Sequence, residues 1–305
     1  MKRSLFIAGL AVCLLFSGCL DFSGQDIFLA RSKNGRDLYA LIVYHGIHSG
    51  GEVEKDCAQL RSRIDGGDAF ALLANWPFEF TKSGIIEGLS ASPEDFPARA
   101  RLAERFRKHF FVHYGGFYLD KQTKLPGFWQ LICITKVKDF VREGNHAINE
   151  DLSQESPNFE QAYPKTAGLW CRGKHEWFNF NGSALELHFP VHPDEFPRIR
   201  SQETVKIFNE DEDNFWKIIS SRNIVSLIQD TQSATFRLGD PDVRSNSIHY
   251  LQDDECTTNL LTTLQQEPLW RGELNVKDMI GAFQGDPDRF VKDMNFRDEP
   301  ETKGP

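Results

Sequence analysis

The chain has 305 residues, a formal net charge of −9 at pH 7 and 40% hydrophobic residues. An acidic chain without a run of Lys and Arg repels phosphate backbones, which excludes nucleic acid as the expected partner. Sequences of the Gly-x-Gly-x-x-Gly and Walker A types are absent, and no cofactor is expected.

The N-terminus has the composition of a secretory signal. Two basic residues, Lys2 and Arg3, precede the apolar run Leu5–Phe16, and two small residues follow it. A run of this length is shorter than the roughly 20 apolar residues that a membrane-spanning helix needs. The pattern therefore predicts a signal peptide over residues 1–18 that is removed from the mature protein.

The end of this signal, Phe16, Ser17, Gly18 and Cys19, resembles the lipobox of bacterial lipoproteins. The resemblance covers only residues 1–19, and Phe16 stands where Leu is usual. It implies cleavage before Cys19 and attachment of acyl chains such as palmitate to that residue. Buried acyl groups contribute about 0.8 kcal/mol per CH₂, so the lipid would hold the domain at a membrane. The alternative is an ordinary cleaved signal, with Cys19 as one more thiol.

The residues after Cys19 bear on which membrane is reached. In lipoproteins of Gram-negative bacteria, Asp directly after the lipid cysteine resembles a signal for retention in the inner membrane. Here that place is taken by Leu20, and Asp21 follows. The expected location is the bacterial cell envelope, in the outer membrane and facing the periplasm. The polar segment 19–37 is expected to be a tether that lifts the domain off the membrane.

Residues 38–44 are a nearly continuous apolar run and predict a buried strand. Val53, Cys57, Leu60 and Ile64 follow at helical spacing and predict a helix over residues 53–64. A glycine-rich loop would join the two elements. Such a loop is a common place for ligands, because strand ends leave a crevice and helix N-termini present N–H groups.

This predicted loop contains candidate metal ligands. His45 and His48, with Glu52 or Asp56, could supply two imidazoles and a carboxylate to a metal such as Zn²⁺. The spacing differs from the helical His-Glu-x-x-His motif of zinc proteases. The alternative is a turn whose histidines bond backbone carbonyl groups.

Alternating segments predict two β-hairpins farther along the chain. The first joins residues 111–119 to 128–137, and the second is centred on Asn181-Gly182, a dipeptide typical of tight hairpin turns. Both are followed by an acidic residue beside Phe, which raises a duplicated hairpin unit as an alternative to chance similarity. Together with the predicted helices, these hairpins indicate an α+β fold with mixed or antiparallel strands.

The expected organisation is one α+β domain over residues 38–285. Residues 253–266 and 275–283 predict two helices near its end. Residues 286–305 are rich in charge and carry Pro287 and Pro300, which predicts a disordered acidic tail.

Four cysteines remain besides Cys19. An oxidising periplasm would allow two disulfides among them, in three pairings that spacing does not distinguish. The alternative is buried thiols in a core large enough to need no disulfide. The four are Cys57, Cys133, Cys171 and Cys256.

Two hypotheses for function follow. The first is a non-enzymatic, membrane-anchored envelope lipoprotein whose domain binds a protein or cell-wall partner, in assembly or as an inhibitor or immunity protein. The second is a metal-dependent periplasmic hydrolase that uses His45, His48 and Glu52 or Asp56.

Overall fold

A computed structural model provides the structure of the chain. It describes the residues 20–49, 52–65, 71–72, 79–80, 82–90, 93–154, 164–172, 175–181, 184–195, 225–229, 233–238, 246–249 and 258–294. Within these ranges, no helix is long and apolar enough to cross a membrane. The α+β fold class expected from the sequence is confirmed.

The chain forms two compact units, in contrast to the single domain expected over residues 38–285. Unit 1 contains residues 1–83, 109–135 and 249–305, and unit 2 contains residues 84–108 and 136–248. The chain passes from one unit to the other more than once. Because each unit is made of several separate segments, the sequence has no single polar linker that marks the boundary between the two units.

Unit 1 is built on a sheet that includes strands β1 (Leu20–Arg31), β2 (Leu38–Ser49), β6 (Pro126–Ile134), β5 (Phe110–Asp120) and β12 (Trp270–Leu274), in that order. Its helices are α2 (Val53–Asp65), α10 (Thr258–Gln266), α11 (Val276–Gly285) and α12 (Pro287–Asp293). The short strands β3 (Ala71–Leu72) and β4 (Glu79–Phe80) pair with each other. Neighbouring long strands are antiparallel except β5 and β12, which are parallel.

The segment expected to be a tether is strand β1. It pairs with β2 along its whole length, from Leu20 opposite Ser49 to Arg31 opposite Leu38. Ile27 and Phe28 point to opposite faces of the sheet, and both are buried. The polar composition of residues 21–37 concealed this strand, because the apolar run from Ile27 to Ala30 is only four residues long.

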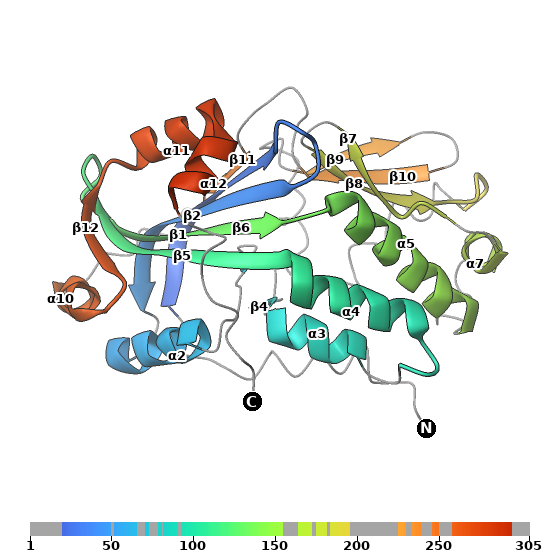
Figure 1. Cartoon of the computed structure of the whole chain (residues 1–305), viewed down its shortest axis with the longest axis horizontal. Helices are drawn as coiled ribbons and strands as arrows, with labels where there is room; N and C mark the ends of the chain where they lie inside the picture. Colours follow the sequence, from blue (N-terminus) through green and yellow to red (C-terminus); the bar gives the residue numbers. More distant parts are fainter. Residues whose placement is uncertain are drawn as a thin grey trace. The chain divides into compact units, whose positions relative to one another are not determined.

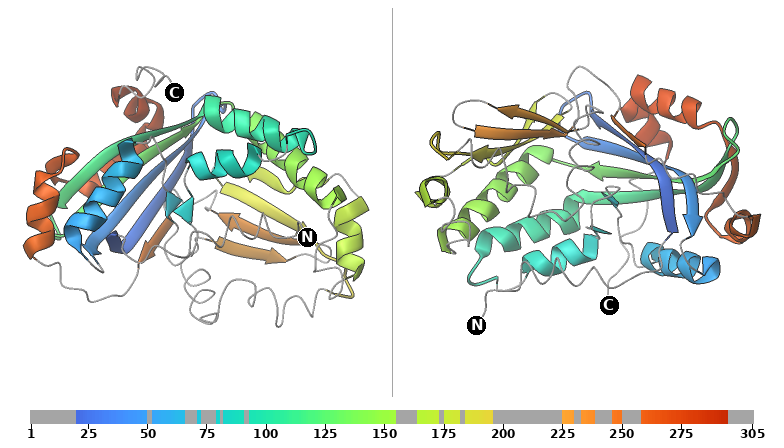
Figure 2. Two further views of the ribbon diagram at one scale, coloured as in Figure 1. Left: turned by 90° about the horizontal axis from the view of Figure 1, so that it is seen from below. Right: turned by 180° about the vertical axis from the view of Figure 1, so that it is seen from behind.

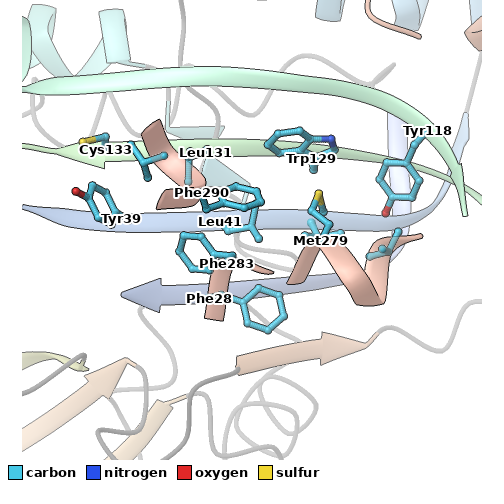
Figure 3. Close-up of a cluster of buried hydrophobic side chains, with 13 residues drawn as sticks. Phe28, Tyr39, Leu41, Tyr118, Trp129, Leu131, Cys133, Met279, Phe283 and Phe290 are labelled. Atoms are coloured by element: carbon cyan, nitrogen blue, oxygen red, sulfur yellow. The ribbon is translucent and has the colours of Figure 1, made fainter. Parts of the chain in front are cut away.

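Helices cover both faces of this sheet (Figures 1 and 2). On one face, side chains from alternate positions of the strands pack against α11 and α12, with Tyr39 and Cys133 toward one end of the cluster and Tyr118 toward the other (Figure 3). On the opposite face, Ile42, Phe128 and Ile132 pack with Cys57 of α2 and Leu264 of α10. Two apolar faces explain why β2 and β6 are apolar at nearly every position.

Gly46 changes the direction of the side chains near the end of β2. Its φ is +61°, a conformation that favours glycine. Before Gly46, the odd-numbered residues Leu41 and Val43 join the first core. After Gly46, the odd-numbered Ile47 joins the opposite core. Simple alternation from the sequence therefore does not describe this end of the strand.

The start of the expected disordered tail is also ordered. Asp286 accepts a hydrogen bond from the backbone N–H of Arg289, and Pro287 occupies the first turn of α12. Phe290 is buried, with its ring centroid 6.3 Å from that of Trp129 and 5.5 Å from that of Phe283. Residues 295–305 of the expected tail lie outside the described residues.

Unit 2 contains a sheet of strands in the order β7 (Phe178–Asn181), β8 (Ala184–Pro190), β10 (Ser233–Leu238) and β9 (Val225–Gln229). Its helices are α3 (Lys82–Ser90), α4 (Pro97–His109), α5 (Val137–Gln154) and α7 (Pro164–Arg172). The first two residues of α3 and the last residue of α4 belong to unit 1. Strand β11 (Asn246–His249) lies at the end of unit 2, and its last residue belongs to unit 1. Pairing of β7 with β8 confirms the hairpin expected near Asn181.

The other expected hairpin, β5 with β6, is confirmed in unit 1. The two hairpins thus belong to different sheets. After β6 the chain enters helix α5, whereas after β8 it forms a turn at residues 193–195. Duplication of a hairpin unit remains an untested alternative.

Candidate functional site

The best-defined polar site in unit 1 is formed by Asp26, His45 and Tyr118. His45 lies in the second half of β2, directly before Gly46, and follows Val43 on the face that α11 covers. Its Nε2 lies 2.9 Å from Oδ2 of Asp26 on the adjacent strand β1. The Asp26 side chain is 11% exposed and that of His45 is 26% exposed. The carboxylate is therefore nearly buried, and the imidazole is at the margin of solvent.

Tyr118 of β5 reaches the same place across strand β6. Its hydroxyl donates a hydrogen bond to the backbone oxygen of Tyr44 at 2.9 Å and lies 3.5 Å from Nδ1 of His45. Gly127 on β6 lies directly beneath the ring. A Cβ atom at that position would lie 2.2 Å from Tyr118 Cζ and 2.5 Å from the Tyr44 oxygen. Only glycine leaves room for Tyr118 to cross β6 and reach His45.

The electrostatics of the site favour a neutral Tyr118. Burial, followed by the negative charges of Asp120 and Asp26, raises the pKa of Tyr118 well above its ordinary value. The hydroxyl therefore stays protonated and donates to Tyr44. Oδ2 of Asp26 accepts a hydrogen bond from the Nε2–H group of His45, which favours the tautomer with the proton on Nε2, and the Tyr118 hydroxyl lies at the longer distance of 3.5 Å from Nδ1.

This geometry determines what the imidazole can do. Each ring nitrogen of His45 already faces a partner inside the fold. Ligation of a metal through Nε2 would displace the contact with Asp26. The arrangement suits an imidazole that joins β1, β2 and β5 at the margin of solvent.

The structure does not gather the proposed metal ligands, His45 and His48 with Glu52 or Asp56, into one site that could hold an ion. The strand continues through His48 to Ser49, so no loop begins at His45. Nδ1 of His48 lies 3.2 Å from the backbone oxygen of Gly46. Glu52 is exposed, and Asp56 is buried. Among the residues described, no three His, Cys, Asp or Glu side chains gather in a way that could hold a metal ion.

Asp56 instead connects helix α2 to the end of β2. Its Oδ2 accepts a hydrogen bond from the Ser49 hydroxyl at 2.5 Å. On the same helix, Arg61 forms two hydrogen bonds with Glu267, which follows α10, at 3.0 and 2.5 Å. These contacts position α2 and α10 on the sheet.

The structure also describes two of the cysteines expected to form disulfides. Cys57 and Cys133 are buried thiols outside any disulfide. They belong to the cores on opposite faces of the sheet, so they could not join each other. Burial, followed by the charges of Glu267 and Asp56, raises the pKa of the Cys57 thiol to about 11. The side chain of Cys171 and all of Cys19 and Cys256 lie outside the described residues.

Two tryptophans of unit 2 are held in place by contacts within the fold. The ring centroids of Trp170 and Trp177 lie 5.7 Å apart, and Trp177 is buried. Their indole N–H groups donate to the backbone oxygen of Pro190 and to Oδ1 of Asn149, respectively.

Sequence reasoning identified His45 but missed Asp26 and Tyr118. Asp26 was placed in the expected tether, because the adjacent apolar run from Ile27 to Ala30 is too short to outweigh the polar composition of the segment. Tyr118 was recognised only as a strand residue, and its contact depends on the order of three strands. Comparison with protein-family models, with curated proteins and with solved structures finds no match to this chain.

Proposed function

We propose that this protein is a lipid-anchored protein of the bacterial envelope whose folded part binds a protein or cell-wall partner without catalysing a reaction. The observation that carries the proposal is the sequence Phe16-Ser17-Gly18-Cys19 at the end of a basic and apolar N-terminal segment. This combination is typical of a signal that directs lipid attachment to Cys19. The outer membrane, facing the periplasm, is the proposed location.

Two properties of the folded part support binding over metal-dependent hydrolysis. The nitrogens of His45 are directed at Asp26 and Tyr118, so the imidazole lacks the open geometry of a metal ligand. The mature chain would also be strongly acidic, since removal of Lys2 and Arg3 changes its formal charge from −9 to −11. Such a surface favours partners with basic groups, and electrostatic attraction would increase the rate of association.

The anchor can be tested directly. The full chain and a Cys19→Ser variant would be produced in a Gram-negative bacterium that is fed labelled palmitate. We expect label and mass consistent with an acylated Cys19 only in the parent protein, and recovery of that protein with the outer-membrane fraction. An unlabelled parent protein recovered in the soluble periplasmic fraction would contradict the anchor.

Binding can be separated from hydrolysis with the purified mature protein. We expect sedimentation with cell-wall material, or site-specific photocrosslinking to one envelope protein, without release of soluble cell-wall fragments. Metal content would be measured in parallel for the parent and for a His45→Ala, His48→Ala double variant. Turnover of a cell-wall, lipid or ester substrate that needs a stoichiometric metal, lost in the double variant, would overturn the proposal.

A further inference from the structure

Strand β1 begins at the residue that follows Cys19. Leu20 is already paired with Ser49 of β2. Consecutive Cα atoms are about 3.8 Å apart, and neighbouring strands are separated by about 4.8 Å. The Cα atom of Cys19 must therefore lie within about 10 Å of Ser49. A lipid on Cys19 would be attached to the sheet itself, with no flexible chain between them.

The residues around this end of β1 are held together. The Ser49 hydroxyl donates to Asp56, which fixes the first turn of α2 to the end of β2. A shallow depression beside this turn is lined by Glu52, Val53 and Glu54 of the α2 start and by Thr262, Thr263 and Gln266 of α10. Leu20, Ser49 and residues 52–55 lie at this end of the hairpin and form the anchor-side surface.

The opposite end of the β1–β2 hairpin is the turn at residues 32–37. The backbone N–H groups of Gly35 and Ser32 close this turn through hydrogen bonds to Ser32 and Asp37, respectively. At about 3.3 Å per residue, a strand as long as β1 separates this turn from Leu20 by at most about 36 Å. The hairpin curves along its length, so the separation is shorter than this limit (Figure 1).

We propose that the anchor-side surface lies directly against the lipid headgroups and that the turn at residues 32–37 points away from the membrane. This inference rests on the proposed lipid attachment at Cys19. The physical reason is reach, because acyl chains buried in the bilayer hold Cys19 at the headgroups, and Leu20 is already part of a rigid sheet. A tether would let the domain tumble, whereas this connection restricts its orientation.

Quenching of a fluorophore by lipid headgroups tests the orientation. The lipidated full-length protein, with Cys171→Ser and Cys256→Ser, would be placed in phosphatidylcholine vesicles that contain a nitroxide-labelled headgroup. A fluorophore would be attached through Lys55→Cys on the anchor-side surface or through Arg36→Cys in the far turn. Both positions are exposed, and both changes remove one positive charge. We expect several-fold stronger quenching at position 55 than at position 36.

A spacer variant supplies the control. Twelve Gly and Ser residues between Cys19 and Leu20 would add a flexible connection with a root-mean-square length of about 19 Å. We expect this insertion to remove most of the difference between the two positions while the lipid remains. Equal quenching at both positions in the lipidated parent, or a difference that the spacer leaves unchanged, would overturn the orientation. Absence of lipid on Cys19 by mass spectrometry would instead overturn the anchor, and the orientation with it.

Discussion

Nε2 of His45 lies 2.9 Å from Oδ2 of Asp26, and this contact joins two segments to which the sequence assigned unrelated roles. Asp26 was expected in a tether, and His45 in a loop that was either a candidate metal site or a simple turn. In the structure both belong to paired strands, and the carboxylate is a partner of the imidazole. Residues expected to be a flexible tether therefore form a strand, and a carboxylate of that strand occupies Nε2 of the leading candidate metal ligand.

The first prediction concerns this contact. Asp26→Asn replaces a nearly buried carboxylate that faces His45, and we expect it to lower the free energy of unfolding by about 1–3 kcal/mol. Asp293→Asn is the matched control, because its 63% exposed side chain pairs with Arg289 at the surface. Its effect should stay within about 0.5 kcal/mol. Urea denaturation of both variants checks this, and equal effects would contradict a structural role for Asp26.

The second prediction concerns the crossing of Tyr118 over β6. Gly127→Ala would place a Cβ atom 2.2 Å from the Tyr118 ring and 2.5 Å from backbone oxygen, so relaxation requires strand movement. We expect a loss of about 3 kcal/mol or more.

Gly281→Ala in α11 provides the opposite case. Its Cβ would meet no atom within 4 Å, and a helical alanine is more stable than glycine by about 1 kcal/mol. Thermal denaturation should therefore show a lower melting temperature for G127A and an unchanged or higher one for G281A. A tolerated G127A would mean that Tyr118 does not pass over residue 127.

The third prediction distinguishes an ordered α12 from a disordered tail. Phe290→Ala removes a buried ring that packs near Trp129 and Phe283, and should cost about 3–5 kcal/mol. Lys292 is exposed on the same helix, and Lys292→Ala should change stability by no more than about 0.5 kcal/mol. Denaturant midpoints measure the contrast. If F290A behaves like K292A, the helix does not pack on the sheet.

The fourth prediction is that the free energy of unfolding depends on Glu195 of unit 2 at acid pH. Burial acts to raise the pKa of Glu195, but hydrogen bonds from the Thr166 hydroxyl and the backbone N–H groups of Lys165 and Thr166 outweigh it. The pKa in the folded state is therefore below its ordinary value. For a lowered carboxyl pKa, the added stability is present above the unfolded value of about 4.3 and is lost as the pH falls through the folded value.

Glu195→Gln tests this dependence. It should destabilise the protein at pH 7 by about 1 kcal/mol, since the carboxylate caps the start of α7. The difference between parent and variant should shrink below about pH 4. Denaturation curves at pH 7, 5 and 3.5 measure it, and a constant difference at all three would contradict the assignment.

The fifth prediction concerns the buried thiols. The pKa of Cys57 is raised to about 11, so little reactive thiolate forms at neutral pH. In a mature domain with Cys19→Ser, Cys171→Ser and Cys256→Ser, Cys57 and Cys133 should react with a thiol reagent only after unfolding. The neutral Cys57 stabilises the fold at neutral pH, and this contribution should fall as the pH rises from about 8.5 toward 11. Rapid labelling of the native protein at pH 7.5 would contradict the burial.

Local patterns in the sequence predicted much of the secondary structure. The helical spacing of residues 53–64 matches α2, and the alternating segments that flank residues 120–127 and Asn181 match the two hairpins. Such elements are visible because their hydrophobic periodicity is set by neighbours close in the chain. The α+β class followed from the same information.

Tertiary structure alone decided which residues meet. Strand β1 is stable because β2 supplies its hydrogen-bond partners. The polar composition of β1 alone does not predict a strand. Gly46 reverses the alternation that parity would extend to His48, and the crossing over Gly127 brings Tyr118 to His45. These contacts depend on strand order and on one backbone angle, neither of which has a local signature. The sequence by itself determined the periodic elements and is the basis of the proposed N-terminal signal, whereas long-range pairing determined the partners of His45.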